Sequence, residues 1–297
     1  MQKKAEQVLF KRLNLNPKNP IEKTKFSEEA VSDLADLHPD AFRTKYQLSG
    51  YWLDVERKTC PLLAVCVLGG SLVLVKKIYK ISPDAAYQTI QQAHRFSLDI
   101  AKFLVETHPT CLRYRDATGH TAIHGAALGG GSTELIQYLV EKNPAVRLMR
   151  DDNGNTPLHC ACVQKQALTM HRVSLLVDDH ATVLKAKNNC GWTPLHFACK
   201  YDAPFDVIKF FVDKWPDASK QLENYKGQTP LALYCMNASR TLQTVQLLLT
   251  AYPGATKIRD VDGNLPMELH ELAELVCKYP ISFAPEERLA KRARTEY

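Results

Sequence analysis

Two nine-residue stretches of this 297-residue chain are nearly identical, and they read Gly154-Asn155-Thr156-Pro157-Leu158-His159-Cys160-Ala161-Cys162 and Gly191-Trp192-Thr193-Pro194-Leu195-His196-Phe197-Ala198-Cys199. Three looser copies begin at Gly119, Gly227 and Gly263, so the five glycines are separated by 35, 37, 36 and 36 residues. This regular spacing indicates a repeat protein, in which each unit buries its apolar surface against its neighbours.

Each copy combines a tight turn with the start of a helix. Asp152-Asn153-Gly154 has the composition of a turn, because glycine accepts a positive φ and Asx side chains bond their own backbone. A threonine follows as helix N-cap, and proline then fits the first helical position, where a backbone N–H would be unpaired anyway. Further along each unit an aliphatic stripe, such as Leu135, Ile136 and Leu139, predicts a second helix.

This unit, with its Thr-Pro-Leu-His-x-Ala motif, resembles the ankyrin repeat, and the resemblance is strongest over residues 115–266. It implies an all-α, ankyrin-repeat-type helical solenoid with about five clear repeats and degenerate units at its ends. Two features depart from the family pattern. The repeats are longer than the usual roughly 33 residues, and Pro-x-Ala, as in Pro216-Asp217-Ala218, stands where many ankyrin repeats have Gly-Ala-Asp.

The domain organisation follows from the extent of the repeat. We expect the solenoid to cover residues 58–279 and a C-terminal tail to occupy residues 280–297. Because Pro39-Asp40-Ala41 repeats the Pro-x-Ala pattern, we expect residues 26–57 to form an N-terminal cap. Residues 1–25 are rich in Lys, Asn and Pro, a composition that predicts a flexible basic arm.

The net charge of +6 belongs to the two ends of the chain. Residues 1–25 contain seven Lys and Arg against two Glu, and residues 286–297 contain four against three, whereas the other 260 residues contain 27 of each sign. A nucleic-acid-binding domain concentrates positive charge on a folded face. The composition therefore argues against nucleic acid as partner of the folded body, and leaves an adaptor that binds nucleic acid through its basic ends as an alternative.

The chain contains no apolar run of the roughly 20 residues that a membrane helix needs, and its first residues lack the apolar segment of a secretory signal. We therefore expect no membrane association and a protein that stays inside the cell, with its nine cysteines reduced. A cytoplasmic location is the main expectation. Nuclear entry is the alternative, because an import receptor could read the tetrad Lys291-Arg292-Ala293-Arg294.

The histidines and cysteines raise the question of a metal site, and His159-Cys160-Ala161-Cys162 is the sharpest candidate. His159 and His196 occupy one repeat position, however, and stacked helices lie roughly 8–10 Å apart, too far for one metal ion. We therefore expect no metal, no cofactor and no catalytic residue. An enzyme, the remaining alternative, would need its site in the degenerate N-terminal third, where His94 and His108 are the residues to test.

In ankyrin-type stacks the hairpin tips and the exposed edge of the first helix line a concave surface. The resemblance therefore implies a protein–protein interaction module, a scaffold, adaptor or inhibitor, which binds another protein through this face. By register, the candidate partner-binding residues are His120, Asn155, Gln164, Trp192, Lys200, Tyr201, Tyr225, Gln228, Met236 and Asn264. Trp192, Tyr201 and Tyr225 either cluster as an interface hot spot or pack on their own repeats.

Overall fold

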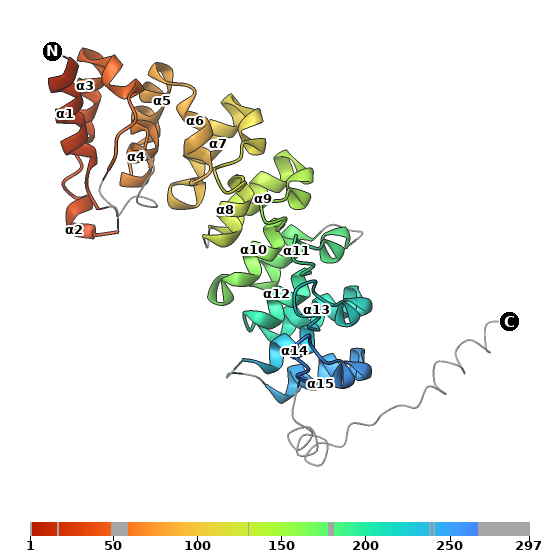
Figure 1. The fold of residues 1–297 in the computed structure, drawn as a ribbon. Coiled ribbons are helices and arrows are strands. Elements are labelled where there is room, and N and C mark those ends of the chain that lie inside the picture. The colour runs from red at the N-terminus through yellow and green to blue at the C-terminus, as the bar shows by residue number, and fades with distance from the viewer. Residues whose placement is uncertain are drawn as a thin grey trace. The chain divides into compact units, whose positions relative to one another are not determined.

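A computed structural model describes residues 2–16, 18–48, 59–129, 131–177, 181–237, 239 and 241–266 (Figure 1). These residues form α-helices, short 3-10 helices and loops without any β-strand, which confirms the predicted all-α class. By its internal contacts the chain divides into two compact units. Unit 1 comprises residues 1–167 with 174–176, and unit 2 comprises residues 168–173 with 177–297. The sequence predicts one continuous solenoid, whereas the contacts divide the chain within α11 (Met170–Leu176).

Unit 1 consists of α-helices that alternate with short 3-10 helices. Its α-helices are α1 (Gln2–Leu13), α2 (Pro20–Lys23), α3 (Glu28–Leu37), α4 (Pro61–Leu68), α5 (Leu72–Ile81), α6 (Ala85–Ile90), α7 (Leu98–Thr107), α8 (Ala122–Leu128), α9 (Thr133–Lys142) and α10 (Pro157–Val163). Its 3-10 helices are η1 (Pro39–Arg43), η2 (Ala93–Arg95), η3 (Pro109–Arg113), η4 (Pro144–Leu148) and η5 (Lys165–Ala167).

Unit 2 repeats the same plan. Its α-helices beyond α11 are α12 (Pro194–Lys200), α13 (Phe205–Lys214), α14 (Pro230–Cys235) and α15 (Leu242–Ala251). Its 3-10 helices are η6 (Thr182–Lys185), η7 (Pro216–Lys220) and η8 (Pro253–Lys257). Within this unit α12 packs against α13 and α14, and α14 packs against α15, so each helix pair covers the next.

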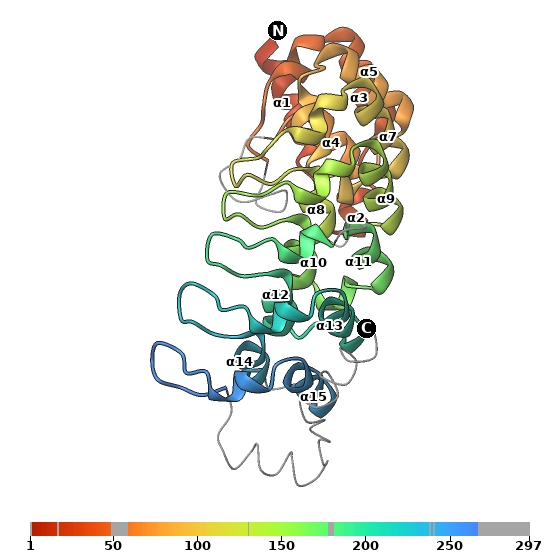
Figure 2. The same cartoon turned by 90° about the vertical axis from the view of Figure 1, so that its right-hand side faces the viewer.

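The predicted hairpin turns are present in both units, and the loops before α8, α10, α12 and α14 project away from the helices (Figure 2). The five turn glycines all have a positive φ: 76° at Gly119, 77° at Gly154, 77° at Gly191, 69° at Gly227 and 82° at Gly263. Backbone hydrogen bonds join neighbouring hairpins, from Asp152 N–H to Thr118 O (3.2 Å) in unit 1 and from Asn224 N–H to Cys190 O (2.8 Å) in unit 2. The glycines are therefore required by backbone geometry.

The proline of most Pro-x-Ala segments opens a 3-10 helix after the second α-helix, whereas Pro83-Asp84-Ala85 leads through a turn into α6. This arrangement occurs at Pro39, Pro216 and Pro253, and also at Pro109 and Pro144, where the tripeptide is less obvious in the sequence. The residue before each proline leaves the helical region, with φ between −135° and −153°. This is the restriction that a proline ring imposes on its predecessor, and it ends the α-helix.

The core of each unit is the apolar face of the second helices together with small residues on the first helices. Ile136 and Leu139 of α9 and Phe211 of α13 are almost completely buried. Cys162 and Cys199 are fully buried at the repeat position that Ala127 also occupies. The eight cysteines among the described residues are free thiols, and those at this position act as small apolar core residues.

The first residues of the chain differ from the flexible arm that the sequence predicts. Residues 2–13 form α1, whose Ala5, Leu9 and Leu13 are buried and which packs against α3, α4 and η1. The three residues are four apart, so they form one apolar stripe, and the exposed Lys and Arg side chains obscure this stripe in the composition. The proposed C-terminal tail, residues 280–297, and the end of the proposed solenoid after residue 266 lie outside the described residues.

Candidate protein-interaction surface

The Thr-x-x-His pattern, which recurs in three repeats, caps the starts of α8, α10 and α12. At Thr193, the backbone N–H donates to His196 Nδ1 (3.1 Å), and the threonine Oγ1 lies 2.8 Å from the same nitrogen. The same pair of contacts occurs at Thr156 with His159 and at Thr121 with His124. Burial lowers the pKa of His196 and of His124 to about 4, so both imidazoles are neutral and free to accept these bonds. These histidines therefore have a structural role.

The hairpins are rigid because one side chain in each accepts two of its backbone N–H groups. Asp151 Oδ1 accepts from Asn153 (2.9 Å) and Asn155 (2.8 Å), and Asn188 Oδ1 accepts from Cys190 (3.0 Å) and Trp192 (2.9 Å). Asp116 and Asp260 accept in the same way. The residue after each turn glycine is thereby held in place. Half of the predicted partner-binding residues occupy this position, namely His120, Asn155, Trp192, Gln228 and Asn264.

Six of the ten predicted residues line one groove of unit 2, which has a volume of about 460 Å³. They are Trp192, Lys200, Tyr201, Tyr225, Gln228 and Met236. Tyr225 is 78% exposed, Met236 62% and Tyr201 41%, which is unusual for such large apolar side chains. The register argument therefore brings residues from two hairpins and two helices to one surface.

The aromatic residues of this groove pack on one another as well as facing solvent. The rings of Trp192 and Phe197 are 5.4 Å apart in an edge-to-face arrangement, and those of Phe197 and Tyr201 are 5.8 Å apart. Trp192 and Tyr201 therefore belong to a rigid aromatic row on α12 and its hairpin. Tyr225 comes from the next hairpin, where its backbone N–H donates to the buried carboxylate of Glu223 (2.7 Å).

Two of these groove residues also line a second cavity of unit 2, which has a volume of about 270 Å³. They are Gln228 and Met236, so this cavity adjoins the groove. Asn264, a seventh predicted residue, lines the same cavity. Gln228 Nε2 donates to Asp260 Oδ2 (3.1 Å), which ties one hairpin to the next. Gln228 thus combines a structural bond with a place on the groove.

The other three predicted residues belong to unit 1. Asn155 donates through Nδ2 to Asp151 Oδ2 (3.0 Å), and Gln164 is exposed at the end of α10. His120 lines a cavity of about 310 Å³ together with Gln91, His94 and others. These residues do not share the groove of unit 2.

Sequence reasoning missed several residues that line the groove, namely Asn188, Cys190, Phe197, Glu223, Lys226 and Leu233. Phe197 carried a detectable signal, because it follows the motif histidine at a position where the preceding repeat has the smaller Cys160. Glu223 carried none. It precedes its glycine by four residues, whereas Asp151 precedes Gly154 by three, and only the structure shows that both open a hairpin.

The two histidines singled out for an enzyme site have different surroundings. His108 lies between the rings of Tyr79 and Tyr87, at 5.6 and 5.5 Å, which is ordinary aromatic packing. His94 lines the cavity beside His120, and its Nδ1 has no hydrogen-bond partner among the described residues. Burial, together with Arg95, lowers the pKa of His94 to about 4. It is therefore a neutral imidazole on a polar cavity wall.

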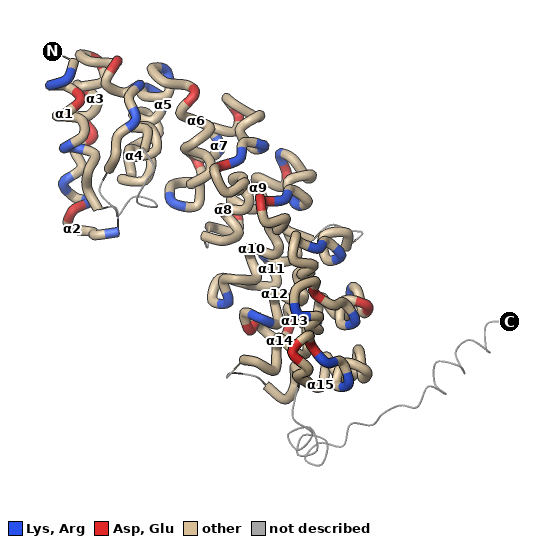
Figure 3. The backbone as a smooth tube through the Cα atoms, in the orientation of Figure 1, with Lys and Arg blue, Asp and Glu red and all other residues tan. Residues whose placement is uncertain are grey.

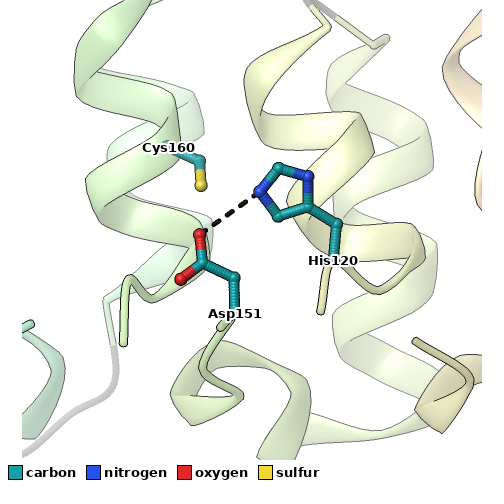
Figure 4. A group of neighbouring side chains, drawn as sticks. All are labelled: His120, Asp151 and Cys160. Carbon is teal, nitrogen blue, oxygen red and sulfur yellow. Dashed lines mark hydrogen bonds and ion pairs between the residues drawn. The ribbon is translucent and has the colours of Figure 1, made fainter. Parts of the chain in front are cut away.

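Three side chains that are distant in the sequence meet in unit 1 (Figure 4). His120, Asp151 and Cys160 each offer one ligand atom, and these atoms all lie within 4.8 Å of one another. The sequence candidate for a metal site paired Cys160 with His159 and Cys162 instead. The fold gives Cys160 different neighbours, because each hairpin lies against the next repeat.

Basic and acidic residues are interspersed along the described part of the chain (Figure 3). Clustered basic side chains occur on α1, where Lys3, Lys4, Lys11 and Arg12 are exposed. Among the described residues, no helix has the length and apolar character needed to cross a bilayer.

Comparison with known proteins agrees with the repeat architecture. The crystal structure of the ankyrin repeat domain of Bcl-3, a unique member of the IkappaB protein family, superposes with a TM-score of 0.51 at 21% sequence identity. The alignment covers 65% of this chain and 83% of that domain, and it supports the fold. No curated protein matched the sequence. A family profile of ankyrin repeats in three copies matches residues 89–173 and 169–262, more than half of the chain. The repeats identified from Thr-Pro-Leu-His-x-Ala are thus ankyrin repeats, which are protein-interaction modules, and the chain belongs to the ankyrin-repeat family.

Proposed function

We propose that this protein is a non-catalytic interaction module, an adaptor, scaffold or inhibitor, that binds a partner protein in the groove of unit 2. The observation that carries this proposal is the gathering of six register-predicted residues around one groove of about 460 Å³. Membership of the ankyrin-repeat family supports it, because such repeats bind other proteins.

The chemistry of the groove suits a protein partner. Aromatic side chains and methionine are enriched in protein interfaces, and tyrosine and tryptophan dominate their hot spots. The row of Trp192, Phe197 and Tyr201 is already packed, so little side-chain entropy is lost when a partner covers it. Tyr225 and Met236 project from the neighbouring repeat, and an apolar side chain of the partner placed between them and the row would be shielded from water.

The polar rim of the groove gives the partner a defined orientation. Lys200 offers an ammonium group, and Lys226 a second one that also pairs with Asp262 at 3.1 Å. Gln228 offers an amide beside the buried carboxylate of Glu223. Glu223 accepts from the backbone N–H groups of Tyr225 and Lys226, which fixes the hairpin that carries Tyr225. A rigid hairpin favours tight binding, since its order does not have to be created on association.

The proposal places the protein inside the cell, in the cytoplasm, with nuclear entry as the alternative. The eight described cysteines are free thiols, the state in which a reducing compartment would keep them. Binding requires no cofactor or metal.

Affinity capture from the native cell with Tyr225→Ala/Met236→Ala tests the proposal. Both side chains are largely exposed, so their loss leaves the fold intact. We expect the affinity for the captured partner to fall by about tenfold or more. Val73→Ala is the matched control, because Val73 is 77% exposed but lies on α5 of unit 1. The proposal is wrong if the control and the double variant retain the same partner equally well.

The same capture separates the alternatives. A partner that is lost at high salt but insensitive to the double variant would favour nucleic-acid binding through the basic ends. A turnover abolished by His94→Ala, with the partner still bound, would favour an enzyme.

A further inference from the structure

The side chains of His120, Asp151 and Cys160 meet at one point of unit 1 although they come from three places in the fold (Figure 4). His120 follows the turn glycine of one hairpin, Asp151 opens the next hairpin, and Cys160 lies in α10. His120 Nε2 is 3.2 Å from Asp151 Oδ2. We propose that these three side chains bind a zinc ion, with water as its fourth ligand.

The distances suit tetrahedral coordination. Zinc bonds of about 2.0–2.3 Å place neighbouring ligand atoms about 3.3–3.7 Å apart. The separation of 3.2 Å between His120 Nε2 and Asp151 Oδ2 lies just below this range. Cys160 Sγ lies within 4.8 Å of both atoms, so a shift of about 1 Å completes the site. A nitrogen, an oxygen and a sulfur ligand with one open position are a combination that zinc accepts.

The charges also balance. Zinc carries two positive charges, and the carboxylate of Asp151 and the thiolate of Cys160 carry two negative charges. Without a cation, burial and the nearby Asp151 raise the pKa of Cys160 to about 12, so the thiol keeps its proton. On metal binding this proton passes to solvent, and the ion offsets the cost of two buried negative charges.

Neighbouring groups already orient the ligands. Backbone N–H groups of Asn153 and Asn155 hold Asp151 Oδ1 at 2.9 and 2.8 Å. The side-chain amide of Asn155 donates to Oδ2 (3.0 Å), the oxygen that also faces His120. The backbone N–H of His120 donates to Asp116 Oδ1 (3.0 Å). The side chain of His120 is 27% exposed and that of Asp151 only 1%, so the ion enters past the imidazole. Hydrogen bonds that orient the ligating groups in this way are typical of metal sites.

The competing explanation is that His120 and Asp151 form only a structural hydrogen bond. Unit 2 contains a bond of that kind with which the contact can be compared. Gln228 occupies the register of His120 and bonds Asp260 at 3.1 Å, the counterpart of Asp151. A glutamine therefore joins two hairpins without any imidazole. His120→Gln keeps this hydrogen bond and removes the metal ligand, which makes it the decisive variant.

Cobalt(II) titration of the full, chelator-treated chain tests the proposal. We expect one cobalt ion per chain, with tetrahedral d–d absorption and a thiolate-to-cobalt charge-transfer band, and displacement by one equivalent of zinc. Cys160→Ala should abolish the charge-transfer band. His120→Gln should weaken binding about tenfold or more with an unchanged circular dichroism spectrum. Cys162→Ala is the matched control, because Cys162 is a buried cysteine of the same helix, and it should bind like the original chain.

Three results would overturn the proposal. They are the absence of saturable cobalt binding, a charge-transfer band that survives in Cys160→Ala, and unaltered affinity in His120→Gln. Since His120→Gln retains the bond to Asp151, its result remains interpretable even if Cys160→Ala fails to fold.

Discussion

The position after the turn glycine differs in chemistry between one repeat of unit 1 and one repeat of unit 2. In unit 1 it is His120, which faces the carboxylate of Asp151, and in unit 2 it is Trp192, which packs edge-to-face on Phe197. The helix position after the motif histidine differs as well, since the repeat of Trp192 has Phe197 there, the repeat of His120 has Gly125, and the repeat that follows it has Cys160. The surrounding scaffold is nevertheless the same, since Gly119 and Gly191 have φ of 76° and 77°. The same backbone therefore carries a polar cluster or an aromatic groove, depending on the side chains after the turn glycine and after the motif histidine.

The largest effect is expected where the two units differ in the space around a turn glycine. At Gly119 a Cβ atom would lie 2.5 Å from the backbone nitrogen of Asp152, whereas at Gly227 it would meet nothing within 4 Å. Both residues have a positive φ, which costs an L-residue about 1–2 kcal/mol. We expect Gly119→Ala to lower the free energy of unfolding by about 3 kcal/mol and Gly227→Ala by about 1 kcal/mol. Urea denaturation measures the free energy of unfolding of both variants. Equal losses would show that the strain of a positive φ alone determines the cost of the added methyl group.

Acid should weaken the repeat through its capping histidines, and His196 in unit 2 is the clearest case. Its folded pKa is about 4, mainly because of burial, against an ordinary value of 6.5. As the pH falls below about 6.5 the unfolded chain takes up a proton that the folded chain does not, so stability declines until the pH reaches about 4. At 1.36 kcal/mol for each pKa unit, the contribution lost is about 3 kcal/mol.

His196→Gln is the control for this acid effect. A glutamine at the third helical position can still accept from the backbone N–H of Thr193 but does not titrate. Chemical denaturation from pH 7 to pH 4 should therefore give a flatter profile for the variant. Parallel profiles would mean that other groups cause the loss of stability.

The sequence predicted the features that depend on local chemistry. Turn glycines, the prolines that begin α10, α12 and α14, and the buried cysteines at the Ala127 position follow from backbone or size constraints that recur from repeat to repeat. Features that depend on contact between repeats were less accessible. The stripe of Leu9 and Leu13 is hidden by exposed basic residues, and the pairing of His120 with Cys160 joins residues 40 positions apart that have different registers.

The residues of the groove could be predicted only in part. Trp192 and Tyr225 could be predicted because they occupy hairpin positions that neither the turn nor the cap requires. Phe197 was missed although it carried a sequence signal, because its place in the groove depends on its edge-to-face contact with Trp192. Glu223 could not be predicted, since its carboxylate holds a hairpin that is one residue longer. Repeat register therefore predicts which positions point to a surface, while the contacts among them depend on the actual side chains.

A smaller effect is expected at the helix start of unit 2. Thr193→Val removes the hydroxyl that lies 2.8 Å from His196 Nδ1, and it keeps the backbone N–H bond to the same nitrogen. We expect a loss of about 1 kcal/mol in the free energy of unfolding. Thr193→Ser retains the hydroxyl and should lose less. If Thr193→Val were as stable as the original chain, the backbone hydrogen bond to His196 alone would form the cap.

The smallest effect on stability is expected in the groove itself. Tyr225 is 78% exposed, so Tyr225→Ala should change the free energy of unfolding by no more than about 0.5 kcal/mol, as Val73→Ala should in unit 1. Thermal unfolding of the two variants side by side measures this. A large side chain that is held in water on a rigid hairpin and contributes nothing to folding is best explained by recognition. A loss above about 1 kcal/mol at Tyr225 alone would instead make it part of the repeat's packing, and the aromatic character of unit 2 would then reflect stability.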